Sequence, residues 1–515
     1  MRSVFLLPLL PVCSALNILF YYAVVGPSHI YFLNSGVKLL LERGHTVDVV
    51  FAVYNELVNL QLLHPQVRRV YYNRHTDPDY WKKNANHFSN MFEKPSTPLG
   101  EFEIFHESGY QLCRNAMKDR ELEEFIASGN YNIGITSDYD PCGNIMITAA
   151  GIPSTASYLS TPLFLPHKVS AGLSSPASVY GTTLYPEHDG SFYDRIFNFL
   201  RLTHYHYYFA PNLQKKYNNL ILKKFGPNFP DVAKIERDVD VVFVNSDQFL
   251  EKQRPLSQKI KYIGGMGVKK ANRLPEEFDK ILSSPASAFV LFSFGTQVPT
   301  VKKPIQVRKN FVEAFKKFPN VTFLWKYDSL ELDAELFENA PNIHRLQWLP
   351  QTELLHDDRV RLFISHMGLN SYLETASAGV PVLSIPLFAD QQNNAQNARD
   401  REMGLLLDRD KLTVSNIENA LEELLGNTKY LENAKAIAKM IKEKPESPEE
   451  IFVKWLEFAA ENPGLHKIFQ LPGADLSPFY YYCGDILVFG LVLSIIVVLF
   501  FKRALKAAFF KVKTD

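Results

Sequence analysis

Cysteine is scarce in this chain, with four residues among 515. So few exclude a disulfide-stapled scaffold, which needs several bridges in a small domain. Cys13 lies in an N-terminal segment that we expect to be removed, and Cys483 borders a long apolar run. Cys113 and Cys142 are left, and they could pair, although nothing in the sequence requires a bridge.

An excess of charge is also missing, because 55 Lys and Arg residues balance 55 Asp and Glu residues. Proteins that bind nucleic acid usually carry a basic field, so we expect no nucleic acid partner. The chain has no GxGxxG after its first expected strand, no GxxxxGKS or GxxxxGKT loop, no HExxH pair and no GxSxG elbow. These absences argue against a dinucleotide dehydrogenase, a P-loop NTPase, a zincin and a membrane-tethered hydrolase.

Apolar material, in contrast, is plentiful, with 46% hydrophobic and 13% aromatic residues. A composition of this kind excludes a disordered protein. Because single cores stop growing at about 250 to 300 residues, 515 residues predict two large domains.

The N-terminus has the order of a secretory signal. Arg2 precedes the apolar run Val4 to Val12, and small residues follow at 13–15. A buried first strand is the alternative, but Pro8 and Pro11 would interrupt it. We therefore expect residues 1–15 to be a signal peptide.

The C-terminus predicts a membrane anchor. Residues 480–501 form a 22-residue stretch whose only charge is Asp485, which is long enough to cross a bilayer. A buried core helix would not explain the basic tail 502–515 directly behind it, since positive flanks stay cytosolic. We expect a single-pass type I protein with a lumenal catalytic part and a juxtamembrane segment at 461–479.

Two further signals agree with a lumenal chain. Lys511 and Lys513 lie five and three places from the carboxyl end, which resembles the dilysine retrieval signals of endoplasmic-reticulum membrane proteins. Asn320 begins an N-x-T sequon, which a lumenal chain can have glycosylated or can carry by chance.

Between the two ends, strand and helix patterns alternate in two blocks. The expected strands are 18–25, 47–51, 131–135, 288–294, 321–325, 362–364 and 380–385, with helices from the spacing of Leu33 to Leu41 and Val307 to Phe315 and over 369–378. This alternation predicts an α/β protein with two doubly wound sheets that face a cleft. The predicted domains are 16–268 and 287–460, with a linker at 269–286.

The region from about Tyr72 to Thr203 shows no such rhythm and is rich in Tyr, Phe and His. We expect irregular loops there, around an apolar pocket.

The densest chemistry lies at 348–391. Gly368 opens a helix whose first N–H groups could hold a phosphate, and His366 could donate to the same oxygens. Glu374 lies one turn into this helix, where a carboxylate can accept both hydroxyls of a ribose. Asp390 and Gln391 follow the next strand and suit sugar hydroxyls.

Trp348 could stack on a base. Taken singly, Trp348 could equally be a core residue, Glu374 a solvated helix residue and His366 a loop residue.

At these residues the chain resembles the UDP-glycosyltransferase family, which includes the animal UDP-glucuronosyltransferases. The similarity is carried by Phe363 to Gln391, Phe292 to Thr296, Trp348 to Gln351 and Tyr262 to Gly265. Met367 is a departure, since animal members usually carry glycine there.

The resemblance implies a GT-B fold, a UDP-sugar co-substrate on the C-terminal domain, an acceptor on the N-terminal domain, and inverting transfer without a metal or other cofactor. It assigns Trp348 and Gln351 to uracil, Glu374 to ribose, Asp390 and Gln391 to the hexose, and Thr296, His366, Gly368, Asn370 and Ser371 to the phosphates.

The same resemblance points to His29 as the catalytic base. Its position after the first strand also favours this role, since such a residue faces the expected cleft. A base needs an acidic partner, and the family's acidic position is Ser137 here. Asp138 is our predicted partner, Asp140 is the alternative, and a loop-capping aspartate is the structural interpretation.

We therefore expect a UDP-glucuronosyltransferase-like enzyme that moves a hexose onto a hydroxyl or similar nucleophile of a small lipophilic acceptor. A catalytically inactive lipophile-binding membrane protein on the same fold is the alternative. Glucose against glucuronic acid, the acceptor, and a homo-oligomeric state stay open.

Overall fold

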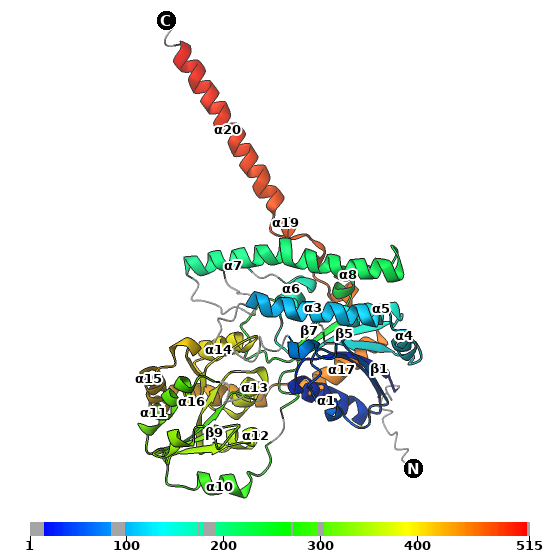
Figure 1. Ribbon diagram of the computed structural model, residues 1–515. Helices are drawn as coiled ribbons and strands as arrows, with labels where there is room; N and C mark the ends of the chain where they lie inside the picture. The colour runs from blue at the N-terminus through cyan, green and yellow to red at the C-terminus, as the bar shows by residue number, and fades with distance from the viewer. Residues whose placement is uncertain are drawn as a thin grey trace, which may run out of the picture.

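The computed structural model describes residues 15–83, 98–137, 139–173, 176–178, 191–268, 271–295 and 303–511, without the side chains of 98–104 and 507–511. Two parallel sheets organise this part of the chain, and one long helix projects away from them (Figure 1). The predicted signal peptide, apart from Ala15, and Lys513 of the tail lie outside the described residues.

The first sheet has seven parallel strands in the order β3-β2-β1-β4-β5-β6-β7. They are β1 (Asn17–Val24), β2 (Thr46–Val53), β3 (Arg69–Asn73), β4 (Ile133–Thr136), β5 (Ser154–Leu159), β6 (Val241–Val244) and β7 (Ile260–Tyr262). Alternate residues of β1 enter opposite cores, Phe20 and Tyr22 on one face and Leu19 and Tyr21 on the other. Burial on both faces explains why this strand is a continuous apolar run.

The second sheet has six parallel strands in the order β10-β9-β8-β11-β12-β13. They are β8 (Ala288–Ser293), β9 (Val321–Lys326), β10 (Ile343–Leu346), β11 (Val360–Ser365), β12 (Val382–Ser384) and β13 (Gly404–Leu406). Val290 and Phe292 pack on one face, and Phe289 and Leu291 on the other. Two doubly wound α/β sheets, as predicted from the sequence, are therefore confirmed.

Helices cover both faces of the two sheets. Those of the first half are α1 (Pro27–Glu42), α3 (Pro98–Ala116), α4 (Arg120–Ala127), α5 (Cys142–Ala149), α6 (Leu165–Ser170), α7 (Phe192–His204), α8 (Ala210–Phe225) and α9 (Val232–Arg237). Those that follow are α10 (Glu276–Leu282), α11 (Ile305–Lys316), α12 (Gln351–Leu355), α13 (Leu369–Ala378), α14 (Gln391–Asp400), α15 (Val414–Gly426), α16 (Lys429–Lys442), α17 (Pro448–Glu461), α18 (His466–Phe469), α19 (Pro478–Tyr481) and α20 (Gly484–Lys511).

Helix α17 returns to the first half, although we expected it in the C-terminal domain 287–460. Phe452 is fully buried in the first core, and its ring lies 5.2 Å from that of Tyr158 and 5.0 Å from that of Phe243. The predicted linker differs too, because α10 lies within it and packs Phe278 and Leu282 into the second half. An amphipathic pattern fixes a helix but not the sheet that it covers.

The prediction of irregular loops between Tyr72 and Thr203 is wrong for much of the described part. This region holds α3 to α7, β4 and β5. Gly109 made α3 hard to predict from the sequence, because glycine disfavours helix interiors. Here it is needed for packing, since a Cβ at this position would lie 2.4 Å from the hydroxyl of Tyr54.

Helix α20 is the projecting helix. Its apolar part, Gly484–Lys506, is long and apolar enough to cross a membrane, and none of it is buried against the rest of the chain. It begins four residues later than predicted, because Tyr480 belongs to α19 and Cys483 has a positive φ of 55° that interrupts the helix.

Candidate active site

The predicted site residues lie where the strand order of each sheet reverses. In the first sheet this point is between β1 and β4, and in the second it is between β8 and β11. Parallel sheets of this type bind ligands outside the carboxyl ends of their strands at such a reversal. His29 follows β1 and residues 137–140 follow β4, whereas Gly295 and His366 follow β8 and β11.

His29 is the third residue of α1, so it lies in the first turn of this helix and not in the loop in which we expected it. Its ring stacks on that of Tyr139 at 5.2 Å, and its Nε2 is 3.4 Å from the Tyr139 hydroxyl. Burial lowers the pKa of His29 to about 4. The imidazole is therefore neutral at neutral pH, which is the form that can accept a proton.

Tyr139 is a site residue that sequence reasoning missed. Its hydroxyl lies 3.1 Å from Oγ of Ser160, beyond β5, as well as near His29. Burial raises the pKa of Tyr139, so it stays a neutral phenol. The only available signal was its place at the carboxyl end of β4, directly after the predicted acidic position.

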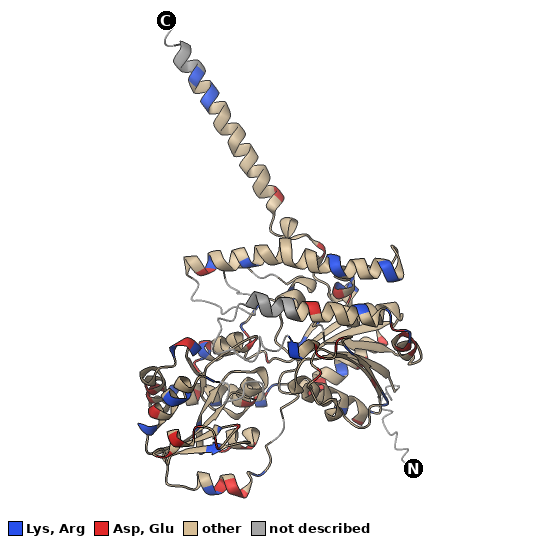
Figure 2. Cartoon of the chain, in the orientation of Figure 1, with Lys and Arg blue, Asp and Glu red and all other residues tan. Residues whose placement is uncertain are grey.

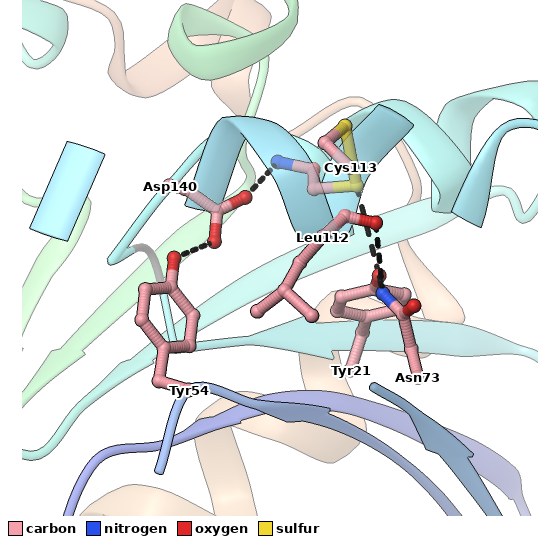
Figure 3. Close-up of a disulfide and its surroundings, with 7 residues drawn as sticks. Tyr21, Tyr54, Asn73, Leu112, Cys113 and Asp140 are labelled. Carbon is pink, nitrogen blue, oxygen red and sulfur yellow. Dashed lines mark hydrogen bonds between the residues drawn. A yellow bond between two sulfur atoms is a disulfide. The ribbon is translucent and has the colours of Figure 1, made fainter. Parts of the chain in front are cut away.

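Two aspartates, Asp138 and Asp140, follow β4 in the sequence. Asp138, our predicted partner of His29, lies outside the described residues. Asp140 accepts a hydrogen bond from the Tyr54 hydroxyl and another, of 2.7 Å, from the backbone N–H of Cys142 (Figure 3). Asp140 therefore secures the start of α5, as a capping aspartate does. Ser137 has a structural contact too, since its Oγ accepts the backbone N–H of Ala23 in β1 at 2.9 Å.

Cys142, the first residue of α5, forms a disulfide with Cys113 of α3. This is the pair that the sequence left open. The bridge ties α3 to the start of α5, two residues after Asp140 (Figure 3).

In the second half, His366 lies between two glycines. A Cβ at Gly295 would be 2.9 Å from its ring, and one at Gly368 would be 2.8 Å from its Nε2. His366 is buried, and burial, followed by the charge of Lys303, lowers its pKa to about 3. A neutral His366 can still donate one N–H to an anion. Thr296, the next predicted phosphate ligand, lies outside the described residues.

Lys303 is a second residue that the sequence analysis missed. It is 3% exposed, and its Nζ lies 4.1 Å from the ring centre of Phe294. Burial lowers its pKa to about 7. Burial therefore leaves Lys303 only partly charged at neutral pH, and an anion bound at this strand edge would favour its charged form. No motif marks it, because it precedes α11 and reaches His366 only through the fold.

Gln351 and Glu374 form a polar pair between α12 and α13. Nε2 of Gln351 donates to Oε2 of Glu374 at 2.5 Å and to Oγ of Ser371 at 3.3 Å. Burial raises the pKa of Glu374. The interpretation of Glu374 as a solvated helix residue is therefore wrong, because it is a desolvated carboxylate with an amide partner.

Trp348 and Asn370 are the exposed members of the predicted set. The Trp348 side chain is 70% exposed, so it is not a core residue and its indole face is uncovered. Asn370 is exposed at the second position of α13, next to its N-cap residue Gly368.

Asp390 and Gln391 open α14. Oδ2 of Asp390 accepts from the Asn394 amide at 2.9 Å, and burial raises the pKa of Asp390 to about 6. The Gln391 carbonyl oxygen accepts the N–H groups of Leu387 and Phe388 at 2.9 and 3.2 Å. The side-chain oxygen of Gln391 thus holds the loop at Leu387 and Phe388, and its side-chain NH₂ group can act as a hydrogen-bond donor.

Tyr139 links the two halves of the site electrostatically. Burial raises the pKa of Tyr139, the bond to Ser160 lowers it, and the charge of Asp390 raises it further. Tyr139 therefore stacks on His29 of the first half and lies within electrostatic range of Asp390 of the second half. The halves are also joined elsewhere, for example by Lys444 and Asp247, whose charged atoms are 2.7 Å apart.

The family model described as UDP-glucoronosyl and UDP-glucosyl transferase matches residues 23–514. The chain belongs to this family. The human UDP-glucuronosyltransferase 1A6 is 27% identical over 92% of this chain and 88% of its own. The bovine UDP-glucuronosyltransferase 3A1 is 26% identical over 95% and 93%.

Solved structures agree on the fold. The calicheamicin glycosyltransferase CalG4 has a TM-score of 0.60 at 15% identity and covers 87% of this chain and 99% of its own. Os79 from O. sativa, solved with U2F and trichothecene, has a TM-score of 0.55 at 20% identity and covers 86% and 99%. The chain is thus a hexosyltransferase of the GT-B fold that uses a UDP-sugar donor, as the sequence predicted.

Proposed function

We propose that this enzyme transfers a hexose from a UDP-sugar to a hydroxyl or similar nucleophile of a small lipophilic acceptor, with inversion at the anomeric carbon. One observation carries the proposal: the ring of Tyr139 stacks on His29 of the first half and lies within electrostatic range of Asp390 of the second half. Inverting transfer needs a base on the acceptor side and sugar contacts on the donor side, and these two residues would supply them.

His29 would be the base. Its neutral imidazole accepts the proton of the acceptor hydroxyl while that oxygen forms the bond to the anomeric carbon. The bond from this carbon to the UDP oxygen breaks, and UDP leaves with the electron pair. Asp138 would orient the resulting imidazolium and stabilise it, and stacking on Tyr139 would fix the ring plane.

The second half would hold the donor. Trp348 would stack on uracil and Gln351 would bind its edge, with Glu374 accepting the ribose hydroxyls. Phosphate contacts would come from Thr296, His366, Gly368, Asn370 and Ser371, and a bound phosphate would favour the charged form of the buried Lys303. Asp390 and Gln391 would bind the hexose, one as acceptor and the other as donor.

The proposed transfer uses no metal and no cofactor besides the UDP-sugar. Within the described ranges, no group of three or more His, Cys, Asp or Glu side chains is placed to hold a metal ion. If the transfer is metal-independent, as we propose, activity will persist after dialysis against a chelator.

The decisive experiment incubates the purified full-length chain with UDP-glucose or UDP-glucuronic acid and a panel of phenols. Mass spectrometry should find one hexoside or glucuronide, and NMR should find a β-linked product from the α-linked donor. His29→Ala is the matched control. A wild-type chain that binds UDP but forms no product with any pair would favour the inactive alternative, for which the comparisons give no sign.

We also propose that the enzyme is a single-pass protein of the endoplasmic-reticulum membrane, with α20 spanning the bilayer and the catalytic part lumenal. The apolar exposed surface of α20 and the basic residues at its far end support this orientation (Figure 2). Replacing Lys511 and Lys513 by serine should release the chain from the endoplasmic reticulum. Asn320 is exposed, so a glycosidase should shift the mass of wild-type chain but not of Asn320→Gln.

A further inference from the structure

The ring of His29 has one side-chain hydrogen-bond partner among the described residues, and that partner is a phenol. The Tyr139 hydroxyl lies 3.4 Å from Nε2 of His29, and the two rings stack with their planes 23° from parallel. Burial lowers the pKa of His29, and the backbone of Ala23 acts against this by raising it. A contact of 3.4 Å is long for a hydrogen bond, but such contacts at catalytic bases often tighten only when substrate is bound.

A second hydroxyl holds the Tyr139 oxygen in place. Oγ of Ser160 is 3.1 Å from it, and either group can be the donor. Tyr139 lies beyond β4 and Ser160 directly follows β5, and these two strands are paired in parallel. The sheet therefore sets the distance between the two hydroxyls, and the serine on one contact and the imidazole on the other restrict the phenol.

A third hydroxyl lies near this pair. Tyr22 is fully buried in β1, and its hydroxyl makes no hydrogen bond in the described part of the chain. Burial raises the pKa of Tyr22, Tyr158 and Tyr139 raise it further, and the nearby Ser160 hydroxyl lowers it. Buried polar groups without a partner are rare in native proteins and call for an explanation. Tyr22 is a spare hydroxyl beside Ser160, which can donate to the serine or accept from it.

Negative charge is missing from the immediate surroundings of the ring. Among the described residues no carboxylate bonds His29. Asp140 bonds Tyr54 and the start of α5, and Ser137 bonds the backbone of β1. The groups placed to respond when the ring becomes charged are therefore neutral hydroxyls.

A row of hydroxyls can respond to a new charge by rotation alone. While His29 is neutral, its free nitrogen lone pair can accept from Tyr139, and the Tyr139 oxygen can accept from Ser160. Once Nε2 carries the proton taken from the acceptor, Tyr139 can accept from Nε2 and donate to Ser160. Each hydroxyl turns about its own C–O bond, so no covalent bond breaks and no further proton moves.

We propose that Tyr139 is a positioning residue for the base: it holds the His29 ring, and its hydroxyl, backed by Ser160, turns from donor to acceptor as the imidazolium forms. The proposal rests on the role of His29 as the base proposed above. Hydrogen bonds to charged groups are stronger than those between neutral groups. The Tyr139 hydroxyl should therefore contribute most in the transition state, where the charge on the ring develops, and should affect kcat more than KM.

The test compares Tyr139→Phe, which keeps the stacked ring and loses the hydroxyl, with the wild type and with His29→Ala. Each is the purified full-length chain with UDP-glucose or UDP-glucuronic acid. Two acceptors of similar shape are used: phenol, whose proton must be removed, and 4-nitrophenol, which is largely ionised in mildly alkaline buffer and needs no base. Tyr71→Phe is the matched control, since the hydroxyl that it removes from the same half bonds Asp119 and not the base.

With phenol, Tyr139→Phe should lower kcat about 10- to 100-fold, as the loss of one hydrogen bond to a charged group predicts. Its KM and its turnover of 4-nitrophenol should stay close to those of the wild type, and Tyr71→Phe should keep wild-type kcat with both acceptors. Ser160→Ala should cause a smaller loss with phenol. Combined with Tyr139→Phe it should add little, because Ser160 acts through Tyr139.

Equal losses with both acceptors would make Tyr139 a structural residue and overturn the proposal. Wild-type kcat of Tyr139→Phe with phenol, in an enzyme that His29→Ala impairs, would overturn it too while leaving the base in place. A loss in Tyr71→Phe as large as that in Tyr139→Phe would show that removing any such phenol hydroxyl has this effect, which also refutes the role. If His29→Ala turns over phenol like the wild type, the base assignment itself fails, and the role of Tyr139 fails with it.

Discussion

We propose that each half of this enzyme contributes part of one active site. The two halves differ in how far apart in sequence their site residues lie. The described donor residues lie mostly in one stretch, from Trp348 to Gln391, around α12, α13 and α14. The proposed acceptor half brings together His29, the proposed base, with Tyr139 and Ser160, and these residues follow three different strands. A nucleotide is a fixed ligand that one local motif can hold, whereas a base for varied acceptors needs only a placed and desolvated imidazole.

The largest expected effect separates chemistry from donor binding. His29→Ala should lower kcat by about 10²- to 10⁴-fold, the usual contribution of a general base. UDP affinity, measured by calorimetry, should stay unchanged, because His29 belongs to the other half. A comparable loss of UDP affinity would show that the halves are not divided as proposed.

The second prediction sharpens the assignment within the acceptor half. Asp138→Asn should lower kcat by a factor comparable to that of His29→Ala, since an amide cannot stabilise an imidazolium. Asp140→Asn should instead lower stability by about 1 kcal/mol, since Asp140 bonds Tyr54 and the start of α5. The double variant of His29 and Asp138 should lose little beyond the worse single variant. Full activity of Asp138→Asn would show that Asp138 is not the partner of His29.

The third prediction concerns Asp390 and the pH profile. The pKa of Asp390 is raised to about 6, so its carboxylate is lost as pH falls through 6, whereas His29, with a pKa of about 4, stays neutral there. The acid limb of kcat/KM near pH 6 should therefore belong to Asp390 and disappear in Asp390→Asn. This variant should also lower turnover about 10- to 100-fold, because a charge-assisted hydrogen bond to the hexose is lost. A limb that persists near 6 would assign it to another group.

The fourth prediction distinguishes nucleotide from sugar within the donor half. Glu374→Ala should weaken UDP binding by about 1–3 kcal/mol, because the ribose hydroxyls lose their acceptor. Asp390→Ala should leave UDP binding nearly intact and affect only the UDP-sugar, since UDP lacks the hexose. Equal affinity of wild type and Glu374→Ala for UDP would refute the ribose role.

The sequence could predict where the candidate donor residues lie on their elements, because the periodicity of these elements is visible. Gln351 begins α12, His366 follows the last residue of β11, and Glu374 lies in the middle of α13. Tyr139 and Lys303 could not be found in this way, since the stacking of Tyr139 on His29 and the electrostatic influence of Lys303 on His366 exist only after the sheets form. Phe452 shows the same limit for the fold, because its helix could have covered either sheet.

The smallest effect tests the one residue at which the donor motif departs from its family. Met367 has a positive φ of 63° and is fully buried, so its backbone favours glycine while its side chain fills the core. Met367→Ala should cost about 2–5 kcal/mol of unfolding free energy, because it leaves a cavity and keeps the strain. Met367→Gly should cost about 1 kcal/mol less than the alanine variant, since the left-handed strain of about 1–2 kcal/mol is relieved. Met403 is the matched control, because it is buried in the same cluster without a positive φ, and there glycine should be worse than alanine. Denaturant unfolding of the four variants gives both comparisons, and the same order at both positions would show that the backbone of Met367 carries no strain.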